Sequence, residues 1–344
     1  MAEPIGVGVI GLGFMGQTHV RAWEAAENPE RAVRVVAVAD RSAERRSGGV
    51  TEGGNLDTGA SERLFDPTRV RAFERAEDLL SDPAVHVVSI CTHTDTHVPL
   101  AIQALNAGTH VLVEKPVAVE AAAVHRLAEA AEKAAEDGLL CMPAMCIRYW
   151  PAYAWLADRV RDGALGPVRS AVFHRLGTRP GWAPGFYDDT KRSGGALVDL
   201  HIHDADFIVH CFGRPRCVAA AGDVHHLTAC YRYGDGPGHI VAEGGWDHAD
   251  GFPFRMRFVV NFEDATADFD IGRDPQLLLC HAGESRPVEL ADASGYDMQV
   301  RALADAIIRG DDAAPVTVRQ AAEVADVLEA ERQALESGLP IDLA

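Results

Sequence analysis

A glycine-rich turn between an apolar run and a helical stretch is the feature that most constrains how this chain folds. The run Ile5–Ile10 has the length and composition of a buried strand, and the GxGxxG motif follows it directly. Its first glycine allows a tight turn, the second brings the backbone close to a diphosphate, and the third lets a helix pack against the strand. The segment predicts a dinucleotide-binding turn whose cofactor contacts are Gly11, Gly13, Phe14, Met15 and Gly16.

The residue that ends the next apolar run indicates which dinucleotide fits. Val33–Ala39 is the second expected strand, and Asp40 follows it near the usual spacing of about 20 residues after the glycines. A carboxylate there accepts hydrogen bonds from an adenosine ribose and repels a 2′-phosphate, so NAD is favoured over NADP. Arg41 is the next residue, and because a guanidinium can hold the extra phosphate, NADP stays an alternative.

The order of the remaining stretches predicts two domains of different architecture. In the first half, short strands such as Val85–Cys91 and His110–Val113 alternate with helices, which is typical of a parallel sheet. In the second half, residues 216–270 carry several strand-like runs separated by turns, which favours an antiparallel sheet. We expect an α/β protein with a Rossmann dinucleotide-binding domain over residues 1–144 and a C-terminal substrate-binding or oligomerisation domain over residues 145–344.

The charge balance narrows the classes of partner. The 344 residues include 32 Lys and Arg against 51 Asp and Glu, a formal net charge of −19. This acidity argues against nucleic acid and against an anionic membrane surface, because both need a basic face. No apolar run is long enough to span a bilayer. The seven scattered cysteines contain no CxxC pair, which is typical of reduced thiols in a cytoplasmic protein.

Three side chains have the chemistry needed to oxidise a secondary alcohol. Residues 194–212 are expected to form one helix, on which Asp199 and His203 are four residues apart and share a face. An imidazole side chain ordinarily titrates near neutrality, so His203 suits a general base, and the carboxylate can orient it. Lys115 follows a predicted strand at the edge where parallel strands meet ligands, and its ammonium can stabilise an oxygen that gains negative charge.

Two longer motifs give the chain a resemblance to a known family. Residues 107–116 read AGTHVLVEKP, and residues 194–206 read GGALVDLHIHDAD. Together with the glycine turn, they resemble the Gfo/Idh/MocA oxidoreductases, the group around glucose–fructose oxidoreductase and inositol dehydrogenases. The resemblance implies a Rossmann domain followed by an α/β domain with a large, mostly antiparallel, open-faced sheet. In many members the open face makes an oligomer contact, so we expect a homo-oligomer, a dimer or a tetramer.

The resemblance also implies an activity. It implies an NAD- or NADP-dependent dehydrogenase that transfers a hydride between nicotinamide and a secondary alcohol of a sugar, polyol or sugar derivative. Lys115, Asp199 and His203 would form the catalytic set, with Lys115 also beside the cofactor and the other two also in contact with the substrate. Glu114 would lie by the nicotinamide ribose, and Thr92 and His97 would lie along the cofactor.

Other candidate residues follow from residue type. Arg148 either touches nicotinamide or substrate or forms a salt bridge at the domain interface. In the loop over residues 177–193, Trp182 and Tyr187 offer aromatic faces that suit a sugar ring. The family often has a cis bond before the proline of its EKP motif, so Lys115–Pro116 is expected to be cis.

No metal is expected in this chain. Two histidines of the 194–206 motif, His201 and His203, are two residues apart and point in different directions on a helix, so they cannot chelate one ion together. His225 and His226 are interpreted as surface or packing residues.

Two alternative functions remain for this scaffold, and the first of them uses the same residues. An NAD-dependent glycoside hydrolase oxidises its substrate transiently on this scaffold, and the sequence separates it poorly from a dehydrogenase. A dinucleotide-sensing protein without turnover needs only the glycine turn, so the complete set of lysine, aspartate and histidine argues against it.

Overall fold

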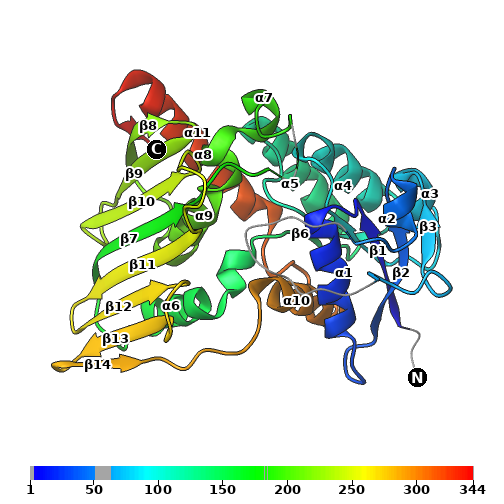
Figure 1. Cartoon of the computed structure of the whole chain (residues 1–344), viewed down its shortest axis with the longest axis horizontal. Coiled ribbons are helices and arrows are strands. Elements are labelled where there is room, and N and C mark those ends of the chain that lie inside the picture. The colour runs from blue at the N-terminus through cyan, green and yellow to red at the C-terminus, as the bar shows by residue number, and fades with distance from the viewer. Residues whose placement is uncertain (1–3, 51–62, 182, 184, 344) are drawn as a thin grey trace. The chain divides into compact units, whose positions relative to one another are not determined.

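The chain forms two compact units in a computed structural model that describes residues 4–50, 63–181, 183 and 185–343 (Figure 1). Unit 1 comprises Met1–Cys146 and Tyr296–Ala322, and unit 2 comprises Ile147–Gly295 and Glu323–Ala344. Among the described residues, no helix has the length and apolar character needed to cross a membrane.

Residues 296–322 return to unit 1 after the chain has built most of unit 2. The sequence pattern places this segment in the second domain. Ion pairs join this segment to the rest of unit 1, since Arg31 lies 2.7 Å from Asp305 and Arg319 lies 2.7 Å from Glu132.

Unit 1 is built on a six-stranded parallel sheet, as expected. The strand order is β3-β2-β1-β4-β5-β6, and every neighbouring pair is parallel. The order reverses between β1 and β4, where ligands of such sheets bind at the carboxyl ends of the strands. The elements are β1 Ile5–Ile10, α1 Phe14–Ala26, β2 Val33–Ala39, α2 Ala43–Arg46, β3 Arg71–Phe73, α3 Ala76–Leu80, β4 Val87–Ile90, η1 Thr94–Thr96, α4 His97–Asn106, β5 His110–Val113, α5 Ala121–Ala135, β6 Cys141–Pro143 and α10 Gly295–Arg309.

Unit 2 is built on a nine-stranded sheet that is mostly antiparallel, which confirms the expected second architecture. The order is β14-β13-β12-β11-β7-β10-β9-β8-β15, and only β7 and β10 run parallel among its pairs. The elements are η2 Cys146–Tyr149, α6 Pro151–Asp162, β7 Val168–Leu176, α7 Thr190–Ser193, α8 Gly195–Asp199, α9 Ile202–Phe212, β8 Cys217–Asp223, β9 His226–Arg232, β10 His239–Gly245, β11 Arg255–Phe262, β12 Ala265–Asp270, β13 Leu277–His281, β14 Glu284–Pro287, α11 Val318–Ser337 and β15 Ile341–Asp342.

One face of the nine-stranded sheet packs against helices of the same unit. Figure 1 shows α6, α8 and α9 on this side. Aromatic rings fill the layer between them and the strands. The ring of Tyr153 on α6 lies 4.7 Å from that of Phe207 on α9 and 5.1 Å from that of Phe258 on β11, both edge-on. The core of unit 2 therefore lies between this face and the helices.

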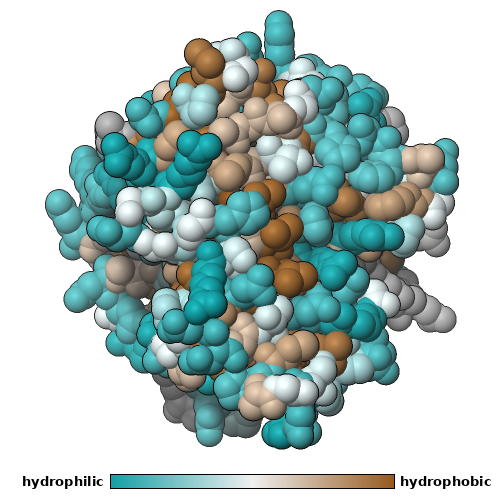
Figure 2. Space-filling view, turned by 90° about the vertical axis from the view of Figure 1, so that its left-hand side faces the viewer, coloured by the Kyte–Doolittle hydropathy of each residue, from teal (hydrophilic) through white to brown (hydrophobic). Residues whose placement is uncertain are grey.

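The opposite face of the sheet carries a row of partly exposed apolar side chains. Burial alternates along β11, so that Phe258 points into the core and Val259 points to the other face. Val172 on β7 pairs in register with Val259 on one side and with Val241 of β10 on the other. Figure 2 shows apolar side chains running through the middle of this face with hydrophilic ones around them.

The expected helix over residues 194–212 is broken into α8 and α9, so that prediction is wrong in its continuity. The break falls at Leu200 and His201, where the backbone N–H of His201 bonds to the carbonyl of Ala196, five residues back. His201 is fully buried, and a Cβ on Gly244 of β10 would lie only 2.7 Å from its side chain. The irregular turn thus accompanies the insertion of a large polar side chain into the sheet layer.

Candidate active site

The glycine turn of unit 1 leaves backbone open at the start of α1. Gly11 has a φ of +86°, and a Cβ on Gly16 would lie 1.8 Å from the Gly11 carbonyl oxygen, so neither position accepts a larger residue. A Cβ on Gly13 would meet only the Arg45 guanidinium, at 4.0 Å. No side-chain hydrogen bond caps the start of α1, and a helix N-terminus favours an anion, so the turn fits a dinucleotide diphosphate. The first turn of this helix also contains Phe14 and Met15.

Asp40 supports the glycine turn as well as the expected ribose site. Its carboxylate accepts hydrogen bonds from the backbone N–H of Leu12 at 2.7 Å and of Ser42 at 2.8 Å. Since an ionised carboxylate has about four acceptor positions, capacity is left for a ribose hydroxyl. Arg45 on α2 lies 3.7 Å from the same carboxylate and was not found by sequence analysis. Arg41 is exposed, and its carbonyl accepts a hydrogen bond from Arg46.

Glu114, at the carboxyl end of β5, is held by two groups of unit 1. One of its oxygens lies 2.9 Å from Nε2 of His19, a fully buried residue on α1, and the other accepts the backbone N–H of Lys115 at 3.1 Å. His19 was missed because a single histidine inside a helix carries no motif. Lys115 is partly exposed, and the Lys115–Pro116 bond is cis, as predicted.

His97 joins two loops at the carboxyl edge of the parallel sheet. Its Nδ1 lies 2.8 Å from the carbonyl oxygen of Pro116, and its Nε2 lies 3.0 Å from that of Thr92. The ring is buried, which lowers the pKa of His97 despite these hydrogen bonds. The hydroxyl of Thr92 accepts a hydrogen bond from Thr96 at 2.7 Å. His97 therefore positions the Lys115–Pro116 segment, and its contact with a cofactor stays a prediction.

In unit 2, Asp199 and His203 stand out by their exposure. Asp199 ends α8, and His203 lies in the first turn of α9. Within residues 195–209 every other residue is buried, while these two are partly exposed. A polar pair that keeps access to solvent in an otherwise buried segment is the arrangement expected of groups that meet a ligand.

The residue between them, His201, is fixed by a buried cluster. Its Nε2 lies 3.0 Å from Glu331 on α11 and 3.1 Å from the hydroxyl of Tyr231 on β9, which donates to Glu331 at 2.8 Å. Burial lowers the pKa of His201, but the charge and the hydrogen bond of Glu331 together with the charge of Asp204 outweigh it, so the pKa is raised. Burial and the same carboxylate raise the pKa of Tyr231 well above its ordinary value.

Two buried arginine pairs hold α9 further along. Asp204 accepts two hydrogen bonds from Arg175 of β7, each 2.9 Å, and Arg175 also donates to Tyr153 on α6 at 3.3 Å. Asp206 accepts two from Arg148, at 2.9 and 2.7 Å. The salt-bridge interpretation of Arg148 thus holds within unit 2, not at a domain interface. A contact of Arg148 with substrate stays a prediction.

Of the two aromatic residues expected to suit a sugar ring, the structure describes one. Tyr187 is partly exposed and packs edge-on against Trp246, with ring centroids 5.6 Å apart. It joins a small core that includes Ala196 and Leu200 of the α8 region. Trp182 lies outside the described residues.

Comparison with known proteins finds a family match in each unit. Residues 5–139 match the family model described as "Oxidoreductase family, NAD-binding Rossmann fold" (GFO_IDH_MocA), and residues 153–267 match "GFO/IDH/MocA C-terminal domain". Among solved structures, this chain is similar to levoglucosan dehydrogenase in complex with NADH and levoglucosan. The match covers 99% of this chain and 100% of the other chain, with a TM-score of 0.83 and 20% sequence identity. An oxidoreductase domain protein from Kribbella flavida has the same TM-score at 24% identity, over 100% of both chains.

Curated relatives match over shorter stretches. Trans-1,2-dihydrobenzene-1,2-diol dehydrogenase of Mus musculus is 34% identical over 157 residues, 45% of this chain and 46% of its own. The scyllo-inositol 2-dehydrogenase (NAD(+)) of Bacillus subtilis (strain 168) is 30% identical over 183 residues, 49% of this chain and 52% of its own. The chain thus spans about half the length of the curated relatives it matches.

The buried pair of Arg175 and Asp204 yields a stability prediction. Arg175→Ala leaves the Asp204 carboxylate buried without its guanidinium, so we expect it to lower the free energy of unfolding by about 3–5 kcal/mol. Arg161→Ala on α6 removes an exposed pair with Asp158 and should stay within about 1 kcal/mol of the parent protein. Urea unfolding followed by circular dichroism measures both. Equal losses in the two variants would contradict a special role for the buried pair.

Proposed function

The chain belongs to the Gfo/Idh/MocA oxidoreductase family, and on that premise we propose that it is an NAD(P)-dependent dehydrogenase acting on a secondary alcohol of a sugar or polyol. The observation that carries the proposal is the selective exposure of Asp199 and His203 within residues 195–209. A sensing protein has no need of an accessible base and carboxylate in that segment. The named activities of the inositol, dihydrodiol and levoglucosan dehydrogenases support the substrate class.

The proposed chemistry assigns one task to each residue. His203 accepts the proton of the substrate hydroxyl, and Asp199 orients its imidazole and stabilises the imidazolium. Lys115 donates a hydrogen bond to the same oxygen and stabilises the negative charge that develops on it. The bound cofactor supplies a nicotinamide ring whose C4 accepts the hydride. The C–O bond then becomes a carbonyl, and the catalytic residues run the same steps in reverse for reduction.

Residues of unit 1 would hold the cofactor. The open backbone at Gly13 and the uncapped start of α1 suit the diphosphate. Asp40 suits the adenosine ribose, and Glu114 suits the nicotinamide ribose, since each is a carboxylate at the carboxyl end of a parallel strand. Arg45 stands close enough to Asp40 to help hold a 2′-phosphate if NADP binds.

Catalysis is tested by two substitutions and a matched control. Lys115→Met and His203→Ala should each lower kcat by about 10²–10⁴-fold, because one removes the oxyanion donor and the other the base. Lys133→Met, an exposed lysine on α5, should retain full turnover. The assay is the rise in nicotinamide absorbance with NAD or NADP and pooled sugars, polyols and sugar acids.

Two outcomes would count against this activity. Unchanged turnover in both variants would refute the catalytic assignment. Release of an aglycone from glycosides without net cofactor reduction would favour the glycoside hydrolase instead.

Cofactor choice is tested at Asp40. Asp40→Asn removes the charge that repels a 2′-phosphate. Leu12 and Ser42 bond to different carboxylate oxygens, so the single amide oxygen can accept from only one of them. That loss affects binding of both cofactors, and the ratio between them cancels it. We expect the ratio of kcat/KM with NADP to that with NAD to rise about tenfold or more, since each 1.4 kcal/mol changes the ratio tenfold. Adding Arg45→Ala should reverse part of the gain. An unchanged ratio in D40N would show that other groups select the cofactor.

We also propose that the open face of the nine-stranded sheet is the contact between copies in a homo-oligomer. The support is the apolar row of Val172, Val241 and Val259 on a face that covers no core of its own unit. Val172→Asp should shift the protein toward monomer in size-exclusion chromatography with light scattering. Ala122→Asp, at an exposed position on α5, is the control. Identical masses for both variants and the parent would refute this contact.

A further inference from the structure

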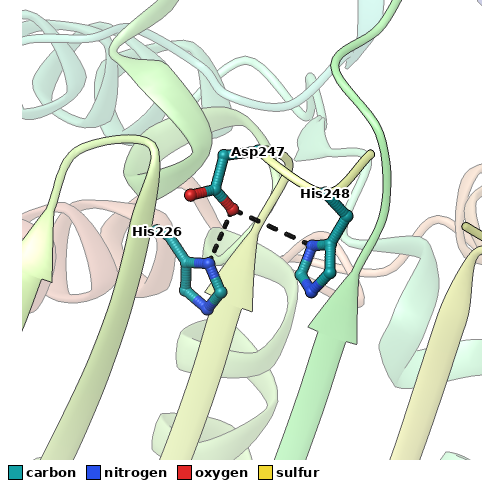
Figure 3. Close-up of side chains that lie close together, drawn as sticks. All are labelled: His226, Asp247 and His248. Carbon is teal, nitrogen blue, oxygen red and sulfur yellow. Dashed lines mark hydrogen bonds and ion pairs between the residues drawn. The ribbon is translucent and has the colours of Figure 1, made fainter. Parts of the chain in front are cut away.

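Three potential metal ligands meet beside the end of β10 in unit 2. His226 begins β9, and Asp247 and His248 follow β10 in the next loop (Figure 3). One ligand atom from each of the three lies within 4.8 Å of the other two. Nδ1 of His226 is 2.6 Å from Oδ1 of Asp247, and Nδ1 of His248 is 3.9 Å from the same oxygen. Figure 3 shows both imidazole rings directed toward the carboxylate.

The far side of the His226 ring is supported by a second carboxylate. Its Nε2 donates to Glu243 of β10 at 3.0 Å, and Glu243 also lies 3.6 Å from His174 of β7. A carboxylate that accepts the outer N–H of a histidine fixes the ring and makes its other nitrogen a better metal ligand. Gly245 makes room for this geometry, because a Cβ there would lie 2.7 Å from the His226 ring.

The ring of His248 is held in place, and its Nδ1 lacks a hydrogen-bond partner. It stacks on Phe252 with ring centroids 4.0 Å apart and planes 23° apart. Its Nδ1 is buried and makes no hydrogen bond. A buried nitrogen of this kind normally finds a partner, and a cation held between it and the Asp247 carboxylate would satisfy both groups.

We propose that His226, Asp247 and His248 bind one divalent transition-metal ion, Zn²⁺ by preference, through two imidazole nitrogens and a carboxylate oxygen. Imidazole and carboxylate are ligands that Zn²⁺ takes at about 2.0–2.2 Å, and three protein ligands leave a fourth position for water. The ion replaces the proton that Nδ1 of His226 shares with Asp247, so binding releases protons to solvent. This proposal departs from the sequence-based expectation that the chain holds no metal.

The surroundings indicate a structural role for the ion. Asp247 forms an isolated β-bridge with Thr178, at the start of the 177–193 loop. The preceding residue, Trp246, packs against Tyr187 of that loop. An ion at this position would therefore tie the loop after β10 to β9 and, through these contacts, steady the 177–193 loop. The proposal is independent of the dehydrogenase function.

The test uses the full chain with any affinity tag removed. The protein is stripped with a chelator, dialysed against Zn²⁺ and analysed for bound metal, and the affinity is measured by competition with a chromogenic chelator. We expect one Zn²⁺ per chain, together with a Co²⁺ derivative whose visible spectrum indicates tetrahedral nitrogen and oxygen ligands. His248→Ala should weaken binding by about 100-fold or more, and Glu243→Gln by about 10-fold or more.

The matched control is His239→Ala, because His239 is an exposed histidine on β10, the strand that also carries Glu243. It should bind Zn²⁺ as tightly as the parent protein, and circular dichroism should show all three variants folded. Less than half an equivalent of Zn²⁺ on the parent chain, or equal affinity in His248→Ala and His239→Ala, would overturn the proposal. So would a His248→Ala variant that is unfolded while Glu243→Gln binds Zn²⁺ like the parent.

Discussion

Buried charge pairs along α9 are the interaction on which the rest of unit 2 depends. Asp204 and Asp206 are almost entirely buried, and each is met by a two-pronged guanidinium. A buried carboxylate without such a partner costs several kcal/mol, so the native packing tolerates little displacement of either arginine. Because Arg175 comes from β7 and Arg148 from the segment before α6, the helix is tied to two elements at once.

This anchoring explains how two accessible polar groups persist in a segment that is otherwise buried. His203 lies between Ile202 and Asp204, both of which point into packed surroundings. Once those neighbours are fixed, the remaining direction for the His203 side chain is also fixed. In unit 1 the turn follows a backbone path that only glycine can take at Gly11 and Gly16, and the carboxylate of Asp40 ties that path to the end of β2. In unit 2, buried arginine–aspartate pairs position the segment that carries the candidate groups. In unit 1, glycines without side chains shape the turn that suits the diphosphate.

Much of the fold was predictable because its signals are local. The strands Ile5–Ile10, Val33–Ala39 and His110–Val113 are each recognisable as a short apolar run within a single segment, and the structure has all three. β3 was not predicted, since it has three residues and its Arg71 and Ala72 are exposed, which leaves no apolar run to detect. The continuous helix over 194–212 failed because helical periodicity does not reveal that His201 must turn into the sheet.

The partners of the site residues were largely beyond sequence reasoning. His19 and Glu114 are 95 residues apart, and Tyr231 and Glu331 are 100 residues apart, so neither pair forms a motif. Motif reasoning singles out the groups proposed to face a ligand, because their chemistry requires particular residue types. It missed those that hold them, because many residue types could do so at many positions.

The path of the chain between the units has a consequence for protein engineering. The boundary is crossed after Cys146, again after Gly295 and a third time after Ala322. A gene fragment that stops at residue 146 therefore encodes an incomplete unit 1, without the acceptor of the Arg31 ion pair at Asp305. A chimera that exchanges unit 2 for that of a relative needs two splice points on its C-terminal side, with residues 296–322 kept from the parent.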